Sequence, residues 1–134
     1  MLYITGKYAL NLPCSLLTCG DWHTSGLKWD NLKCRESGES IFEEYGIESG
    51  KSVPGHNKKY NVANHIRALL DLLELGLFGA AQGMNKDYIC NDGYNDEIFN
   101  QVLRMKNLEH WDGIDRFMGK EYFSKWLDYR EKHI

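Results

Sequence analysis

One segment, residues 61–75, constrains the fold more than any other part of the chain. Its apolar side chains recur at the three- and four-residue spacing of a helix face, and Leu72 and Leu75 widen that face. Asn61 is suited to cap the start of such a helix, and Gly76 is suited to end it. Because so wide an apolar face must be covered on several sides, we expect residues 61–75 to form the central helix of the core.

The residues before this helix predict strands and loops. Near the N-terminus, apolar residues occupy even positions, as in a strand with one buried face: Leu2, Ile4, Tyr8, Leu10 and Leu12. Pro13 should end this strand, and residues 14–35 are typical of short strands or irregular loops. Ser40 can cap one or two helical turns over residues 40–48, before an exposed loop at residues 49–59.

Helices dominate the prediction for the rest of the chain. A short helix is expected at residues 77–82, and Asn95 can cap a longer helix that ends near Lys106. A last helix should begin near His110, and Gly119 is expected to weaken it and divide it in two.

These patterns together predict an α+β fold, with a small β-containing N-terminal part packed on a mainly helical C-terminal half. The length of 134 residues fits a single domain, 1–134, with a β- and loop-rich part at 1–60 and a helical part at 61–134. The hydrophobic fraction of 43% and the charged fraction of 26% are those of a folded domain, not of a disordered chain.

Charge and hydropathy limit the classes of partner. The net charge is −3 and Lys58-Lys59 is the one basic cluster, whereas nucleic-acid-binding proteins usually carry a basic stripe. No apolar run approaches the roughly 20 residues that a membrane span needs, and the N-terminus lacks the pattern of a signal peptide. We therefore expect a cytoplasmic protein with no membrane partner, whose four cysteines stay reduced.

The densest set of reactive side chains lies in the stretch CSLLTCGDWH and at Cys34. Zinc is bound by four Cys or His ligands in a tetrahedron, and Cys14, Cys19, His23 and Cys34 could supply them. Their spacing, C-x4-C-x3-H-x10-C, lacks the C-x2-C pair of common zinc modules, so the alternative is that they are reduced cysteines in a core. Apart from such a zinc ion, no cofactor is expected.

The same stretch would also allow a thiol enzyme. A catalytic cysteine needs a base and an orienting group, and Cys19, His23 and Asp21 offer these three types. The alternative is that Asp21 caps a turn and His23 makes a structural hydrogen bond. The chain has no phosphate loop, GxGxxG, HExxH or GxSxG motif, which favours a binding protein over an enzyme.

Three polar residues interrupt the apolar pattern of the central helix. His65 shares a face with Leu69, so we expect a partly buried, hydrogen-bonded histidine and not a metal ligand. Arg67 and Asp71 are four residues apart and should form a solvated ion pair, the alternative being one charged wall of a binding cleft.

Aromatic side chains are the main sign of a binding role. They make up 13% of the chain, with four Trp and eight Tyr, which is more than a small core needs. Exposed Trp and Tyr are enriched in protein interfaces. We expect a partner-binding surface that contains Trp22, His23 and Trp29, with Tyr45 and Tyr60 beside the exposed loop.

A resemblance rests on four blocks of the chain: YITGKYALNLPCSLLTCGDWH, VANHIRALLDLL, AQGMNKDYICN and FMGKEYFSKWL. They resemble small uncharacterised proteins of Gram-positive bacteria that are often carried on mobile elements, over about residues 2–127. The resemblance transfers no catalytic residue, but its setting implies a role in toxin–antitoxin or phage–host conflict.

The sequence therefore predicts a small cytosolic protein-binding module, such as an antitoxin, immunity or inhibitor protein of a mobile element. One alternative is a nucleic-acid-binding regulator. The other is an enzyme or zinc site built on the cluster of Cys14, Cys19, Asp21, His23 and Cys34.

Overall fold

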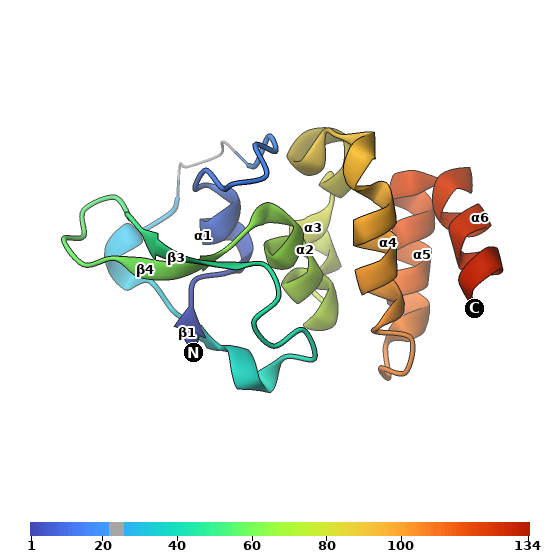
Figure 1. Ribbon diagram of the computed structural model, residues 1–134, viewed down its shortest axis with the longest axis horizontal. Helices are drawn as coiled ribbons and strands as arrows, with labels where there is room; N and C mark the ends of the chain where they lie inside the picture. The colour runs from blue at the N-terminus through green and yellow to red at the C-terminus, as the bar shows by residue number, and fades with distance from the viewer. Residues whose placement is uncertain (22–25) are drawn as a thin grey trace.

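The structure, a computed structural model, describes residues 1–21 and 26–134 (Figure 1). Short antiparallel strands lie near the N-terminus and helices fill the C-terminal half, which confirms the α+β class. The elements in chain order are β1 (Leu2–Tyr3), α1 (Gly6–Leu10), η1 (Trp29–Asn31), β2 (Arg35–Glu36), η2 (Ser37–Glu39), β3 (Ile47–Lys51), β4 (Tyr60–Ala63), α2 (His65–Glu74), α3 (Phe78–Ala81), η3 (Met84–Ile89), η4 (Asp92–Tyr94), α4 (Asn95–Leu103), α5 (Trp111–Tyr122) and α6 (Ser124–His133).

Helix α2 lies at the centre of the fold, as its apolar pattern predicts (Figure 1). Its residues are buried from His65 to Leu73, and only Glu74 at its end is partly exposed. Helices α1, α3 and α4 and strand β4 pack around it. Because apolar burial contributes about 25 cal/mol per Å², this helix supplies much of the stabilisation of the core.

The start of α2 differs from the prediction, whereas its end does not. The cap is Asn64 and not Asn61: the Asn64 side chain accepts a hydrogen bond from the backbone N–H of Arg67 at 2.8 Å. Asn61 lies in strand β4, where pairing with other strands holds the backbone extended. Gly76 follows the helix with a φ of +76°, the left-handed conformation that glycine adopts readily at a helix end.

The N-terminal strand is shorter than the alternating pattern predicts. Strand β1 pairs with β2, and Ile4 adds an isolated bridge to Val62. The chain then turns at Gly6, with a φ of +63°, into helix α1, which packs on α2 and buries Leu10. A strand over residues 2–12 is therefore wrong beyond Ile4, because the later apolar residues are buried by helix packing.

A β-hairpin occupies most of the region between residues 47 and 63. Strands β3 and β4 pair antiparallel, with Ile47 opposite Ala63. The helical turns predicted at residues 40–48 do not build a helix. Hydrogen-bonded turns occupy residues 41–46, but Glu43 has a φ of +49°, outside the right-handed helical region, and the chain enters β3 at Ile47. Of the loop predicted at residues 49–59, only residues 52–59 connect the two strands, because β3 extends to Lys51.

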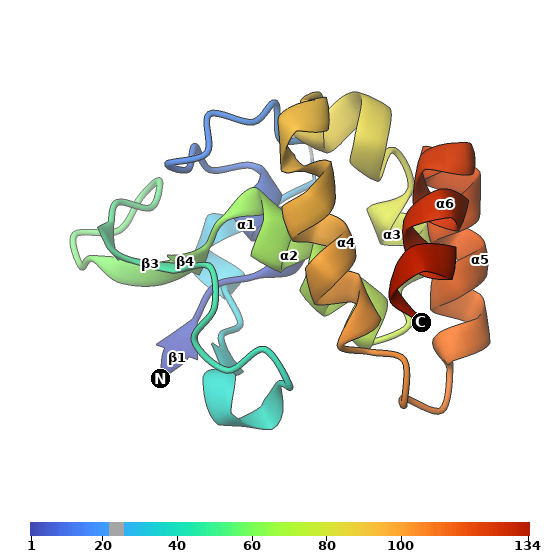
Figure 2. The ribbon, with the colours of Figure 1, turned by 45° about the vertical axis from the view of Figure 1, so that its right-hand side comes forward.

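Helices α4, α5 and α6 form the end of the molecule opposite the hairpin (Figure 2). Phe99 of α4 lies edge-on to three aromatic rings of α5 and α6, with ring-centroid distances of 4.9 to 5.4 Å: Tyr122, Trp126 and Tyr129. Much of the aromatic content therefore serves packing, since such pairs add about 0.5–1.5 kcal/mol beyond area burial.

The last helix is divided, but not at the predicted glycine. Gly119 lies within α5, and the break falls at Phe123, which has a φ of 53° and a ψ of −133°. The backbone N–H of Phe123 still bonds to the Gly119 carbonyl at 2.9 Å, so α5 completes its last turn before the chain reverses direction into α6.

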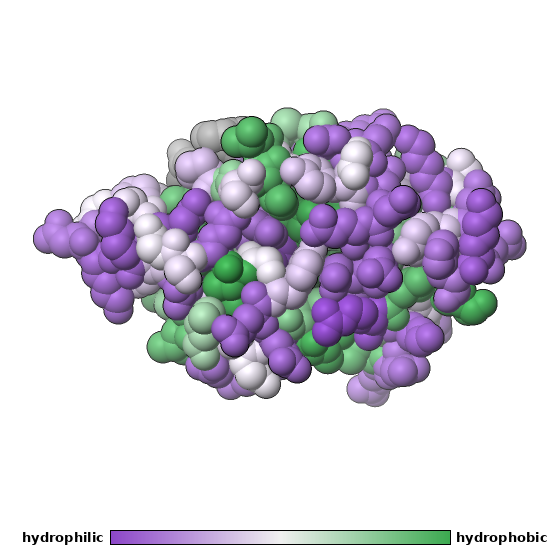
Figure 3. Space-filling model, in the orientation of Figure 1, coloured by the Kyte–Doolittle hydropathy of each residue, from purple (hydrophilic) through white to green (hydrophobic). Residues whose placement is uncertain are grey.

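In the view of Figure 3, the surface is mixed: hydrophilic side chains cover most of the α4–α6 end, and apolar ones form small separate groups. Among the residues that the structure describes, no helix has the length and apolar character to cross a membrane.

Candidate functional site

The predicted zinc ligands are not brought together by the described part of the chain. Cys14 is buried, whereas Cys19 and Cys34 are exposed. Within the described ranges, no group of three or more Cys, His, Asp or Glu side chains could hold a metal ion. His23, the fourth predicted ligand, lies outside those ranges, as does Trp22, so a zinc site that uses His23 stays a prediction.

The predicted thiol set is only partly described. Asp21 is buried, and its backbone N–H donates to the Leu10 carbonyl at 2.8 Å. Cys19 lies beside a cysteine that sequence reasoning did not consider, Cys90. Burial and the neighbouring Cys19 thiol raise the pKa of Cys90 to about 11. Since His23 lies outside the described residues, a catalytic role for Cys19, Asp21 and His23 stays a prediction.

His65 is buried and hydrogen-bonded, as expected. Its Nδ1 lies 2.6 Å from Thr18 Oγ1, and its Nε2 lies 2.7 Å from the Leu12 carbonyl oxygen. Cys14 Sγ lies 3.6 Å from the same Thr18 oxygen. The structure thus pairs the histidine with Cys14, which no local motif indicates because the two residues are far apart in sequence.

The Arg67–Asp71 pair is not solvated, which corrects the prediction. Neither residue is exposed, and Arg67 Nε lies 2.8 Å from Asp71 Oδ1. Arg35 adds a second guanidinium 2.9 Å from that oxygen, and Tyr3 donates to Asp71 Oδ2 at 2.5 Å. The pair is buried because β1, β2 and the segment before β3 cover this face of α2, so it forms no wall of an open cleft.

The described members of the predicted partner surface pack against their own chain. Trp29, Tyr45 and Tyr60 are all half-buried. The Trp29 ring lies edge-on to a neighbouring tyrosine, Tyr8, with centroids 5.2 Å apart. The Tyr45 hydroxyl is bonded to a carboxylate and the Tyr60 hydroxyl to a histidine nitrogen. These contacts give each side chain a structural role, and an additional role in binding stays a prediction.

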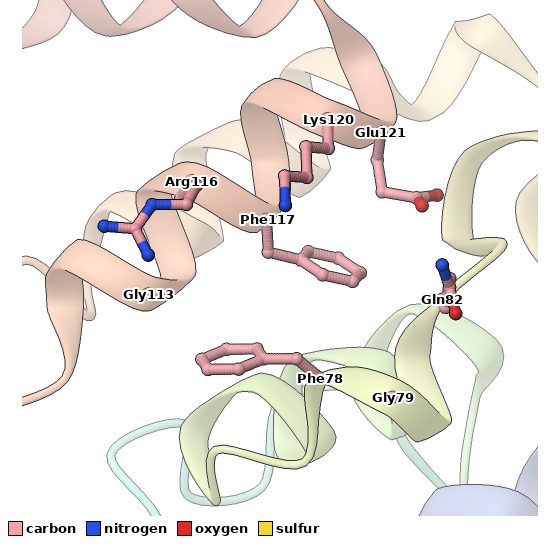
Figure 4. Close-up of a pocket in the computed structure, with 8 residues that line it drawn as sticks. All are labelled: Phe78, Gly79, Gln82, Gly113, Arg116, Phe117, Lys120 and Glu121. Carbon is pink, nitrogen blue, oxygen red and sulfur yellow. The ribbon is translucent and has the colours of Figure 1, made fainter.

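A hollow between α3 and α5 combines apolar walls with free charges (Figure 4). Its volume is about 350 Å³. The rings of Phe78 and Phe117 face each other across it, with centroids 6.0 Å apart and planes inclined by 26°. Gly113 makes room for this arrangement, because a Cβ there would lie 2.9 Å from the Phe78 ring.

Two cations lie on the α5 side of the hollow. Arg116 and Lys120 are exposed and one helical turn apart, and neither side chain has a hydrogen bond or ion pair to any residue in the described ranges. The one carboxylate in the lining, Glu121, accepts from the backbone N–H groups of Gly83 at 3.3 Å and Asn85 at 3.0 Å. The acidic charge is therefore engaged at the start of η3, and the two basic charges remain available.

The apolar surface continues from the hollow toward α6. Phe123 and Leu127 are 60% and 42% exposed, and both line an adjoining hollow together with Arg116 and Lys120. Phe123 also has the positive φ of 53°, which costs a residue with a Cβ about 1–3 kcal/mol. We call Phe78, Phe117, Arg116, Lys120 and Phe123 the α3/α5 face.

Sequence reasoning missed the α3/α5 face. Its residues come from α3, α5 and the residue that follows α5, and no short motif links Phe78 with Phe117. The one available signal is the i, i+4 spacing of Arg116 and Lys120, which is also typical of an ordinary solvated helix face. Comparisons with protein-family models, with curated proteins and with solved structures find no match to the chain.

Proposed function

We propose that this protein is a protein-binding module, an antitoxin, immunity or inhibitor protein, that occludes its partner through the α3/α5 face. The observation that carries the proposal is the pair of free cations, Arg116 and Lys120, beside the facing rings of Phe78 and Phe117. Binding energy at protein interfaces is concentrated in aromatic and arginine residues of this kind. The suggestion of an antitoxin, immunity or inhibitor role comes from the resemblance to proteins of mobile elements.

The charges on this face determine the chemistry of the partner. The whole chain has a net charge of −3, yet the hollow presents two free cations and one engaged carboxylate. A partner segment that packs an apolar side chain against the rings of Phe78 and Phe117 and carries carboxylates beside it would complement both the apolar wall and the cations. The occupant is therefore an acidic, apolar segment of a second protein.

The backbone at Phe123 supports the same face. A large apolar side chain that is 60% exposed gains little from folding, and its conformation carries a strain that glycine would avoid. Phe123 therefore lowers the stability of the isolated fold, and burial of its ring in a complex would compensate for that loss.

A photo-crosslinking benzophenone residue, placed at Phe123 or at Trp29 in the native host, tests the proposal directly. The Phe123 position should give one stoichiometric protein adduct that mass spectrometry identifies. The Trp29 position probes the surface predicted from the sequence. An adduct from Trp29 but not from Phe123 would show that the α3/α5 face is the wrong surface.

Charge reversal then measures the contribution of the cations to affinity for the purified partner. Arg116→Glu with Lys120→Glu should weaken binding at least about tenfold. Lys58→Glu with Lys59→Glu makes the same charge change at the hairpin and should alter affinity by less than about twofold. Equal losses in both variants, or steep salt-dependent binding of the parent protein to duplex DNA, would overturn the proposal.

A further inference from the structure

The segment from Leu12 to Thr18 folds over the start of α2 and encloses the His65 ring. The Leu12 carbonyl can only accept, so His65 Nε2 carries a proton and donates to it at 2.7 Å. His65 Nδ1 is then an acceptor in the neutral ring and receives the Thr18 hydroxyl proton at 2.6 Å. Thr18 Oγ1 is left to accept from the thiol of Cys14, whose sulfur lies 3.6 Å away.

This geometry connects the Cys14 thiol to a base. The proton of the thiol can pass to Thr18 while the Thr18 proton passes to His65 Nδ1. The products are a thiolate and an imidazolium, held beside the first residue of the ten-residue helix α2. The partial positive charge at a helix N-terminus and the imidazolium both favour the thiolate.

The electrostatics of the surrounding groups act in the same direction. Burial raises the pKa of the Cys14 thiol, but the neighbouring His65 and Thr18 favour the thiolate more and bring the pKa to about 7. Burial lowers the pKa of His65, while its contacts with Cys14 and Leu12 raise it more.

In the described part of the chain, Glu48 and its ion-pair partner Lys51 are charged groups near this pair. Glu48 also favours the charged form of His65. It is itself paired with Lys51 at 3.0 Å, and it accepts from the backbone N–H of Ser15 at 3.1 Å. This pairing holds Glu48 on the segment that carries Cys14.

We propose that Cys14 is a nucleophilic thiol, with His65 as its base acting through Thr18, and that it exchanges with small disulfides. The Cys14 thiolate attacks one sulfur of the disulfide, a new S–S bond forms, and the old S–S bond breaks. One small thiolate leaves and takes up the proton that Cys14 gave to His65. Cys14 is oxidised to a mixed disulfide, and one half of the small disulfide is reduced to a thiol.

The test uses a full-length variant in which Cys14 is the sole thiol: Cys19→Ser, Cys34→Ser and Cys90→Ser. Its rate of reaction with 2,2′-dithiodipyridine, a small neutral disulfide, is followed from pH 5 to pH 10 by the absorbance of the released thiopyridone. The rate should rise with a midpoint near pH 7. The Cys14 thiol of the urea-unfolded variant should show a midpoint near the ordinary value of about 8.5.

His65→Gln in the same background should raise the midpoint by at least about one unit and slow the reaction at pH 7 by about tenfold. The matched control is His56→Gln, which removes another doubly hydrogen-bonded histidine, remote from Cys14, and should leave the midpoint unchanged. If His65→Gln does not fold, Thr18→Val tests the relay and should also raise the midpoint.

Two results would overturn the proposal. One is a folded parent variant that does not react although its urea-unfolded form does, which would mean that the sulfur is inaccessible. The other is a midpoint near 8.5 that neither His65→Gln nor Thr18→Val alters, which would mean that Cys14 is an ordinary thiol.

Discussion

Arg67 and Asp71 form an ion pair of 2.8 Å on successive turns of α2, with neither side chain exposed to solvent. The arginine also donates to the carbonyl oxygens of Glu43 and Tyr45 at 2.7 and 2.6 Å. Two guanidiniums and two carboxylates, counting Arg35 and Glu74, balance the charge of the cluster. This pair therefore ties the central helix to the N-terminal part of the chain.

Asp71→Asn should destabilise the protein by about 3–5 kcal/mol, because it leaves the Arg67 charge buried without a counter-charge. Urea unfolding followed by Trp fluorescence measures the change. Asp92→Asn is the matched control, since it breaks an ion pair of 2.9 Å whose side chains are 58% and 69% exposed. The control should cost less than about 1 kcal/mol, and equal effects would contradict the structural role of the buried pair.

Tyr3 makes stability depend on alkaline pH. Burial, with the hydrogen bond to Asp71, raises the pKa of Tyr3 to about 12. A raised pKa in the folded state gives a contribution that is complete below the unfolded value of about 10 and is lost as the pH rises toward 12. Between pH 9 and pH 11, the free energy of unfolding should therefore fall by about 1 kcal/mol less in Tyr3→Phe than in the parent. The same fall in both proteins would contradict this role of Tyr3.

Two glycines of α5 should respond differently to alanine. A Cβ at Gly119 meets no atom within 4 Å, so Gly119→Ala should stabilise the protein by about 0.5–1 kcal/mol. At Gly113 the Cβ would lie 2.9 Å from the Phe78 ring, which must move, so Gly113→Ala should gain less or lose stability. Urea unfolding compares the two variants, and equal gains would show that Phe78 does not lie against Gly113.

Phe123 should lower the stability of the isolated protein and raise its affinity for the partner. Phe123→Gly relieves the backbone strain at a φ of 53°, whereas Phe123→Ala removes the same ring but keeps a Cβ. The glycine variant should be more stable than the alanine variant by about 1 kcal/mol in urea unfolding. Both should lose affinity for the partner to the same degree, and an alanine variant at least as stable as the glycine variant would refute the strain.

The helical core could be predicted because it depends on local periodicity. The apolar face of residues 65–74 and the stop at Gly76 follow from the order of residues alone, whereas the start predicted at Asn61 is wrong because strand pairing holds that residue in β4. The strand over residues 2–12 was mispredicted because alternating apolar residues satisfy either a strand or a short helix buried on several sides. In such a stretch, contact with α2 decides the outcome.

The sequence by itself therefore determined the α+β class, the central helix and the residue types available for chemistry. Only the tertiary structure decided which of them meet. Arg67 and Asp71 are buried because Tyr3 and Arg35 arrive from other segments. Cys14 meets His65, and Phe78 meets Phe117, through packing of elements far apart in the chain. A local sequence pattern shows whether one segment has the periodicity of a helix or a strand. The burial of a side chain, its pKa and its ion-pair or hydrogen-bond partners depend on the neighbours that folding brings together.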